Sequence, residues 1–242
     1  MSTGTAPDAP GRFAVRSPHS TQNVGLTRER IVDAALRLMD EHGVGEFTTR
    51  RLAAELGVRA PTLYWHFPSK QALEDACVEA VLGVLELPET DAGAGGWADG
   101  VRVLMASVRD QLGRHPSVIA LMGRSHPPSV GRVSTEGLHL MRAAGLDWPD
   151  AFLFCRLMIW RIVGFTSMEH TLRTSSEVHT VERAQPDRHR PTRFRLRETW
   201  PPGEPDEVQA LSTAVDLDAM FRADIEVFVA GVEARARARQ PG

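Results

Sequence analysis

The sequence predicts an all-α protein with a small N-terminal helical domain and a larger C-terminal one. Three observations support this prediction. Apolar residues recur at helical spacing in segment after segment. Ser or Thr precedes several of these segments, as at helix N-caps, and Gly follows several of them, where helices end. The chain has 242 residues and 42% apolar side chains, enough for a real core in one large or two small domains.

Composition indicates a soluble globular protein. Cys77 and Cys155 are the only cysteines, and both lie within helical patterns. They are predicted to be buried small side chains, which suits a reducing compartment. Residues 1–20 lack the apolar core of a secretory signal, and no apolar run approaches the roughly 20 residues needed to cross a bilayer. We therefore expect a cytoplasmic protein without a membrane partner.

The first 25 residues are rich in Ser, Thr, Pro and Gly without periodicity, and we expect residues 1–25 to be a disordered tail. The first helix is predicted from Thr27 to Glu41. Thr27 is its N-cap, and Gly43 ends it. Its apolar stripe should support the elements that follow.

The next segment, TTRRLAAELGVRAPTLYWHFPSK, spans Thr48–Lys70 and predicts two short helices joined by a tight turn. Thr48 caps the first helix, and Gly57 ends it because glycine enters a left-handed C-cap at little cost. Pro61 lies in the first turn of the second helix, where its missing N–H is harmless, and Pro68 follows that helix. A DNA-binding helix-turn-helix has this layout, and its second helix enters the major groove.

Local charge supports DNA binding. Four basic side chains and one acid lie between Thr48 and Lys70, so this segment carries a net charge of +3, whereas the whole chain carries −3. Positive charge is thus concentrated where phosphates would be met. The alternative is an amphipathic hairpin buried in an all-α core, with solvated arginines. The turn glycine, the proline at the helix start and the aromatic cluster at 64–67 favour DNA binding.

The run GVGEFTTRRLAAELGVRAPTLYWHFPSKQAL, residues 43–73, resembles the DNA-binding domain of TetR-family transcriptional repressors. Its PTLYWHF segment looks closest to the tetracycline-repressor branch. The resemblance is strong over residues 26–85 and later rests on helix layout and short patches, such as FRADIEVFVAGVEA at 221–234. It implies a three-helix helix-turn-helix domain, a larger ligand-binding and dimerisation domain, and a homodimer that represses transcription from a palindromic operator.

The resemblance also implies which side chains contact the double-stranded DNA operator. Arg50 can bind a guanine bidentately, while Tyr64 and Lys70 suit phosphates. Of Trp65 and His66, one is expected to contact the DNA backbone and the other to pack against the first helix. The predicted DNA-binding residues are Arg28, Thr48, Thr49, Arg50, Arg59, Ala60, Pro61, Thr62, Tyr64, Trp65, His66 and Lys70.

Two departures separate this chain from the tetracycline repressors. They carry a glutamine directly before the Pro-Thr-Leu-Tyr-Trp-His run, where this chain has Ala60, so we expect a different operator. Met122 takes the place of a histidine that helps to hold their drug-bound magnesium. Since methionine is no magnesium ligand, we expect no metal and no cofactor.

A further helix is predicted from Ser69 to Leu85. In the family this helix connects the two domains, and tilting it changes the separation of the two DNA-reading heads in a dimer. Pro88–Gly96 is a linker by composition. The predicted boundary therefore separates a DNA-binding domain at 26–87 from an effector-binding and dimerisation domain at 88–242.

The C-terminal part predicts helices at Trp97–Leu112, Ser117–Gly123, Ser134–Ala144, Pro149–Leu172 and Leu211–Arg239, with a turn-rich connection over Ser125–Gly131. Pro149–Leu172 is apolar on most of its circumference and should be central. Arg156 and Arg161 interrupt it, which indicates a face that meets a partner or a polar pocket. The two long helices suit a four-helix dimer bundle, with intramolecular packing as the alternative.

Residues 174–205 contain prolines and arginines without a core pattern, so we expect a flexible loop. Six arginines at 183–197 leave a second DNA-binding patch as the alternative. Arg12 and Arg16 of the tail could likewise reach a minor groove, although an untethered tail is the simpler interpretation.

The apolar C-terminal part suits a small, mainly hydrophobic effector. The predicted effector-binding residues are Leu104, Met105, Met122, His126, Phe154, Met158, Trp160, Phe165 and His170, each of which could instead be core. No Gly-rich phosphate loop, zinc-type spacing or nucleophile elbow is present, so we do not expect an enzyme. A DNA-binding regulator without an effector, and an activator, are the alternatives.

Overall fold

The computed structural model describes residues 26–88, 96–174, 193–194 and 215–239. The predicted tail at 1–25 with Arg12 and Arg16, and most of the predicted linker at 88–96, lie outside the described residues. So does the predicted loop at 174–205 with its arginines, apart from residues 174 and 193–194.

The N-terminal helices begin and end where capping residues direct them. Thr27, Thr48 and Ser69 each accept a hydrogen bond from a backbone N–H three residues on, at 3.3, 3.1 and 3.0 Å. Gly43 and Gly57 take φ values of 82° and 67°, a region that glycine enters at little cost. The elements are α1 (Arg28–His42), a 3₁₀ turn (Val44–Glu46), α2 (Thr49–Glu55), α3 (Ala60–His66) and α4 (Lys70–Leu82). The predicted helix-turn-helix is confirmed, with α3 as its second helix.

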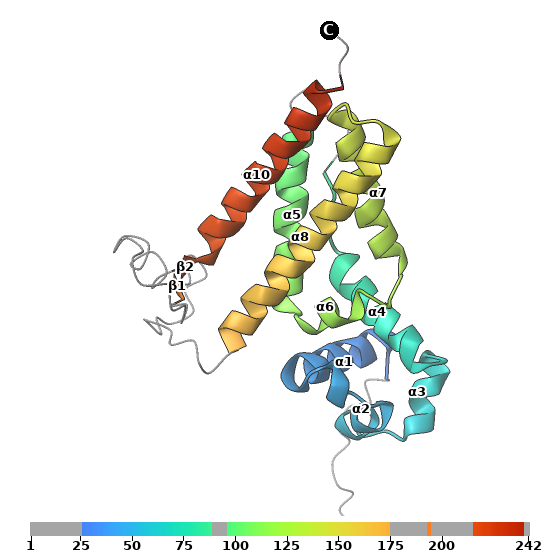
Figure 1. The fold of residues 1–242 in the computed structure, drawn as a ribbon. Coiled ribbons are helices and arrows are strands. Elements are labelled where there is room, and N and C mark those ends of the chain that lie inside the picture. The colour runs from blue at the N-terminus through green and yellow to red at the C-terminus, as the bar shows by residue number, and fades with distance from the viewer. Residues whose placement is uncertain (1–25, 89–95, 175–192, 195–214, 240–242) are drawn as a thin grey trace, which may run out of the picture.

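The described C-terminal part is built almost entirely of helices, which confirms the all-α class. These are α5 (Gly96–Arg114), α6 (Ser117–Leu121), α7 (Pro128–Ala143), α8 (Trp148–Thr174) and α10 (Leu217–Arg237), with a two-residue antiparallel ladder of β1 (Arg193–Phe194) and β2 (Val215–Asp216). In Figure 1 α5, α7, α8 and α10 stand as an upright bundle, and α1, α2 and α3 form a compact unit below it. The α4 helix packs against α1 and also against α5, α6 and α7, so it joins the two parts.

Two predicted boundaries in this part are wrong. The segment Ser125–Gly131 is not all connection, because α7 already begins at Pro128. A proline at the first helical position costs no hydrogen bond, so the Pro127–Pro128 pair starts a helix here. The last helix begins at Leu217 and not at Leu211, because Asp216 is its N-cap and accepts from the Ala219 N–H at 2.9 Å.

The α8 helix, which the sequence places at the centre, is covered by this chain on only part of its circumference. One face packs on α5, α7 and α10, but the other exposes large apolar side chains. On α8 these are Phe152, Leu153, Leu157, Trp160 and Met168, and α10 adds Met220 and Val227. An apolar helix face left open to water is typical of a surface that another protein covers.

By length and mean hydropathy, α8 also qualifies as a possible membrane span, contrary to the expectation that no run approaches that length. Its contacts favour another role. Arg161 pairs with Asp224 of α10, and Glu169 accepts from Arg109 of α5 at 2.9 and 3.0 Å. We therefore assign α8 to the helical bundle.

The two cysteines are buried, as predicted. Desolvation raises the pKa of the Cys77 thiol to about 12 and that of Cys155 to about 11. At neutral pH both are therefore protonated and weakly nucleophilic, which fits packing roles.

Candidate nucleic-acid interface and effector cavity

The helix-turn-helix rests on a buried apolar base. Leu52 of α2 and Leu63 of α3 are buried, as are Phe47 and Phe67 at their flanks. This base turns the remaining side chains of both helices outward. The Tyr64 hydroxyl lies 3.5 Å from the Thr49 hydroxyl, so the two helices present their polar groups on one surface.

Three of the predicted DNA-binding residues also hold this surface together. The Arg28 guanidinium donates to the His66 carbonyl and lies 4.2 Å from the Phe67 ring centre, so it clamps α1 to the end of α3. Thr48 caps α2. Lys70 Nζ donates to the Phe47 carbonyl at 2.9 Å and thus fastens the start of α4 to the segment before α2.

Solvent exposure distinguishes the two aromatic-cluster residues that the sequence left open. Trp65 is 90% exposed, whereas His66 is partly buried and its carbonyl accepts a hydrogen bond from Arg28 of α1. Tyr64 is half exposed. Of the other predicted residues, Arg50, Arg59 and Pro61 are exposed, and Thr49, Ala60 and Thr62 are partly exposed.

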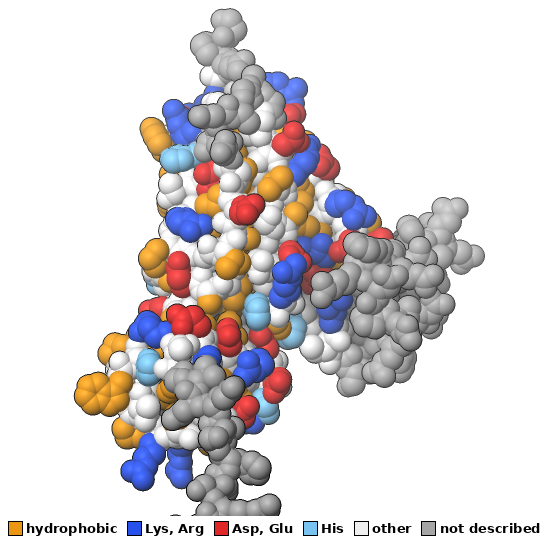
Figure 2. All heavy atoms as spheres, turned by 180° about the vertical axis from the view of Figure 1, so that it is seen from behind, with side chains coloured by type: hydrophobic (Ala, Val, Ile, Leu, Met, Phe, Trp, Pro, Cys, Tyr) orange, Lys and Arg blue, Asp and Glu red, His pale blue; other side chains and the backbone are white. Residues whose placement is uncertain are grey.

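Electrostatics on this surface favour an anion. Arg50, Arg51 and Arg59 are exposed, and across the described parts of the chain none of them forms an ion pair. Figure 2 shows Lys and Arg side chains gathered at the outer end of this unit, beside exposed hydrophobic ones. Arg51 contributes to the positive charge of the Thr48–Lys70 segment, but the family resemblance did not predict it as a DNA contact. Its position beside Arg50 at the start of α2 makes it an additional candidate.

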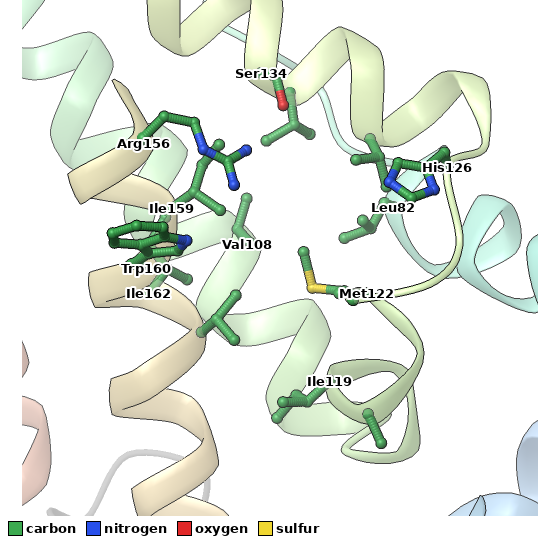
Figure 3. Close-up of a pocket in the computed structure, with 15 residues that line it drawn as sticks. Leu82, Val108, Ile119, Met122, His126, Ser134, Arg156, Ile159, Trp160 and Ile162 are labelled. Atoms are coloured by element: carbon green, nitrogen blue, oxygen red, sulfur yellow. The ribbon is translucent and has the colours of Figure 1, made fainter. Parts of the chain in front are cut away.

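A cavity of about 470 Å³ lies in the C-terminal bundle, close to its junction with the DNA-binding unit. Five helices and the α6–α7 connection line it, mostly with apolar side chains. The lining consists of Leu82 from α4, Val108 from α5, Ile119 and Ala120 from α6, Met122, Gly123 and His126 from the connection, Val130, Val133 and Ser134 from α7, and Arg156, Ile159, Trp160, Ile162 and Val163 from α8. Figure 3 shows Arg156 and Trp160 on one wall and His126 on the opposite one.

The predicted effector-binding residues divide into two groups. Met122, His126 and Trp160 line the cavity. The other six lie elsewhere: Leu104, Met105 and Met158 are fully buried in the core, Phe154 and Phe165 pack on the Phe228 and Phe221 rings of α10 at 6.1 and 4.9 Å, and His170 is partly buried near the end of α8.

Sequence reasoning missed most of the lining, but one signal was available. Arg156 interrupts the most apolar stretch of the chain, and it lies at the cavity. Arg161, the second interruption, pairs instead with Asp224. The apolar lining residues carry no such signal, because their spacing is that of ordinary core.

The cavity and the DNA-binding surface are linked through α4. Leu82 at its end lines the cavity, and Lys70 at its beginning is fastened beside α2. Bonds from the cavity side hold the middle of α4: Arg124 donates to Glu74 at 3.0 Å, and the Ser129 N–H donates to Glu79 at 2.8 Å. A helix of this length spans about 20 Å, so displacement at one end reaches the other.

No group of three or more His, Cys, Asp or Glu side chains in the described ranges is placed to hold a metal ion. The cavity lining has one histidine, His126, and no acid. His126 is thus the one His, Cys, Asp or Glu side chain of the described lining that could ligate a metal ion.

Comparison with known proteins agrees with this architecture. The family model for bacterial regulatory proteins of the tetR family matches residues 31–77, and the model for the tetracyclin repressor-like C-terminal domain matches residues 87–236. An HTH-type transcriptional regulator of Saccharopolyspora erythraea is 31% identical over 182 residues, which are 74% of this chain and 76% of the relative.

Two solved structures share the fold. BioQ with its double-stranded DNA operator has a TM-score of 0.59 and 24% identity, covering 87% of this chain and 99% of BioQ. ActR of Streptomyces coelicolor in complex with actinorhodin has a TM-score of 0.65 and 23% identity, covering 88% of this chain and 99% of ActR. With both family models matched and a relative aligned over most of its length, this chain belongs to the TetR family of bacterial transcriptional regulators.

Proposed function

We propose that the protein is a ligand-responsive transcriptional repressor of the cytoplasm, which binds a palindromic operator as a homodimer. A small, mainly hydrophobic effector that binds in the cavity releases the repressor from this operator. The observation that carries this proposal is the position of α4, whose last residue, Leu82, lines the cavity and whose start is bonded to the DNA-binding unit through Lys70.

The DNA-binding part of the proposal rests on the surface of α2 and α3. Exposed Arg50, Arg51 and Arg59 supply positive charge, and Thr49, Thr62 and Tyr64 supply neutral donors. Phosphate contacts from such side chains set affinity and register, while base-edge contacts from the recognition helix set specificity. BioQ, which shares the fold, was solved with a DNA operator.

The dimer rests on the open apolar faces of α8 and α10. Leu153, Leu157 and Met168 on α8 are exposed, as are Met220 and Val227 on α10. The same faces from a second copy would cover these side chains and complete a four-helix bundle. We propose 26–87 and 88–242 as the DNA-binding and the effector-binding and dimerisation domains.

Release follows from geometry. Two recognition helices in a dimer must enter major grooves about one helical turn apart, so a small change in their separation abolishes simultaneous binding. A ligand that pushes on Leu82 tilts α4 and moves the unit attached to its other end. A cavity of this volume suits a drug-sized compound, and ActR, with the same fold, was solved with actinorhodin.

Operator selection tests the proposal. Purified protein is incubated with randomised duplex DNA at moderate salt, the retained DNA is sequenced, and the mass of the complex is measured by sedimentation. We expect an enriched palindrome with two protomers bound. A monomer on a non-symmetric site would contradict the dimer, and no enrichment by effector-free protein would contradict operator binding.

A further inference from the structure

Among the described residues, the cavity lining contains one arginine, Arg156, and no acidic side chain. Arg156 is exposed and lies on the cavity wall, where Figure 3 shows its guanidinium pointing into the cavity. No carboxylate from the described ranges pairs with it, and no Asp or Glu lines the cavity. The other two arginines of α8 differ, since Arg161 pairs with Asp224 and Arg173 bonds Glu169 at 2.7 Å.

The surroundings of Arg156 are apolar with a few polar exceptions. Val108, Ile119, Ile159 and Ile162 belong to the walls. The Trp160 ring, one helical turn from Arg156, has its centre 5.8 Å from the guanidinium carbon. His126 and Ser134 are the other polar side chains of the lining.

This combination favours one class of ligand. A guanidinium offers planar, paired N–H donors that fit the two oxygens of a carboxylate or similar oxyanion. Such a pair is stronger in a cavity with apolar walls than in bulk water, because the local dielectric is lower. A neutral hydrocarbon would fill the space between the apolar walls. It would also remove water from the Arg156 guanidinium without offering it a hydrogen-bond partner.

We propose that the cavity binds an amphipathic organic anion. Its carboxylate or comparable oxyanion binds the Arg156 guanidinium, its apolar body lies among the aliphatic walls, and Trp160 covers the region beside the charged group. This inference rests on the proposed function in that it names the chemical class of the effector. It narrows a mainly hydrophobic effector to one with a single negatively charged end.

A pair of probes isolates the contribution of the charge. Anilinonaphthalene sulfonate and phenylnaphthylamine share one aromatic body, and only the first carries an anionic group. Binding of each is measured by fluorescence titration and calorimetry on the full chain without DNA. The variants are Arg156→Met, Arg156→Lys and, as a matched control, Arg37→Met, which removes an exposed arginine of α1 far from the cavity.

We expect Arg156→Met to lower the affinity for the anionic probe by about tenfold or more, because one charge-assisted hydrogen-bonded pair is lost. The affinity for the neutral probe should change by less than about twofold, since the contacts of that probe are apolar. Arg156→Lys should recover much of the anionic affinity because it keeps the charge. Arg37→Met should alter neither probe.

A further variant shows that the probes bind in the cavity. Gly123 lines it, and a Cβ added there meets no atom within 4 Å, so Gly123→Trp adds a large side chain at the lining without a clash at its Cβ. We expect the Gly123→Trp variant to bind neither probe. Equal effects of Arg156→Met on the two probes, or probe binding that survives Gly123→Trp, would overturn the proposal.

Two other results are also decisive. If Arg156→Met weakens self-association and leaves both probes unchanged, then Arg156 binds a carboxylate of a second copy and the proposal is overturned. If the anionic probe depends on Arg156 but the protein retains no operator in selection, the organic-anion site stands and the proposed repressor function fails.

Discussion

Asp40 of α1 reaches across to His115, which precedes α6, with 3.0 Å between Asp40 Oδ2 and His115 Nδ1. The other carboxylate oxygen accepts the Ser117 backbone N–H at 3.1 Å. One side chain thus ties the first helix of the DNA-binding unit to α6, and Ile119 of α6 lines the cavity. A ligand that moves α6 would act on the DNA-binding unit here as well as through α4.

We predict that Asp40 and His115 are energetically coupled. Asp40→Asn and His115→Ala should each lower the free energy of unfolding, and a double-mutant cycle should give a coupling of about 0.5–1.5 kcal/mol, as for a partly buried hydrogen bond. Urea unfolding of the four proteins measures it. Strictly additive effects would show that this contact does not join the two parts.

Trp65 is expected to contribute to DNA binding and not to stability. It is 90% exposed, so Trp65→Ala should change the free energy of unfolding by less than about 0.5 kcal/mol. Operator affinity, measured by fluorescence anisotropy on the selected duplex, should fall about tenfold or more if the indole contacts DNA. Val103→Ala removes an apolar side chain that is 50% exposed on α5 and is the control. An affinity loss of equal size in both variants would contradict a role for Trp65.

Gly57 is required by backbone geometry at the turn between α2 and α3. Its φ of 67° strains any residue with a Cβ, so Gly57→Ala should lower the free energy of unfolding by about 1–2 kcal/mol. A Cβ there meets no atom within 4 Å, so the cost is conformational and not steric. Gly57→Asn should cost less, because asparagine tolerates this region better.

Gly45→Ala provides the matched control for Gly57. A Cβ at Gly45 also meets open space, and its φ is not positive. Thermal unfolding should therefore show a clear loss for Gly57→Ala and almost none for Gly45→Ala. Equal losses would mean that the left-handed conformation is not what the turn demands.

Stability should depend on pH through Asp150. This carboxylate in the first turn of α8 accepts two hydrogen bonds from Arg235 of α10, at 2.7 and 3.0 Å. Those bonds lower the pKa of Asp150 below its ordinary value of 3.8. A group with a lowered pKa stabilises the fold above that ordinary value and loses the contribution as the pH falls through the lowered one.

The corresponding variant is Asp150→Asn. Its free energy of unfolding should be lower than that of the wild type at about pH 7. The difference in free energy between the two proteins should shrink as the pH falls below about 4. Urea unfolding over this range measures both proteins. A difference that stayed constant down to about pH 2 would show that the charge of Asp150 is not what stabilises α8 against α10.

Local signals explain how much of the fold could be predicted. Thr48, Gly57 and Pro61 determine caps and a turn from neighbouring atoms alone, so the helix-turn-helix could be placed from the sequence. Pro128 was ambiguous, since a proline can interrupt a chain or begin a helix. The apolar circumference of α8 predicted burial but left open whether the same chain or a second copy covers it, because helical periodicity does not identify the partner.

The cavity was harder to predict because it depends on packing between helices. Leu104 and Val108 lie four residues apart on α5 and both are buried, yet only Val108 lines the cavity. Their sequence signals are identical, and only the positions of α7 and α8 separate them. Arg156 was the exception, because a charge within an otherwise apolar helix indicates a position outside the packed core.

Ligand binding in the cavity and operator binding should weaken each other, and this opposition can be measured. A compound is chosen by calorimetry for binding the wild type but not Gly123→Trp, and operator affinity is then measured with and without that compound at saturation. Coupling between two sites is reciprocal, so a ligand that releases DNA must also bind more weakly to the operator complex. We expect the operator affinity to be at least about tenfold weaker with the compound bound, which is a typical coupling. Unchanged operator affinity with the cavity filled would contradict it.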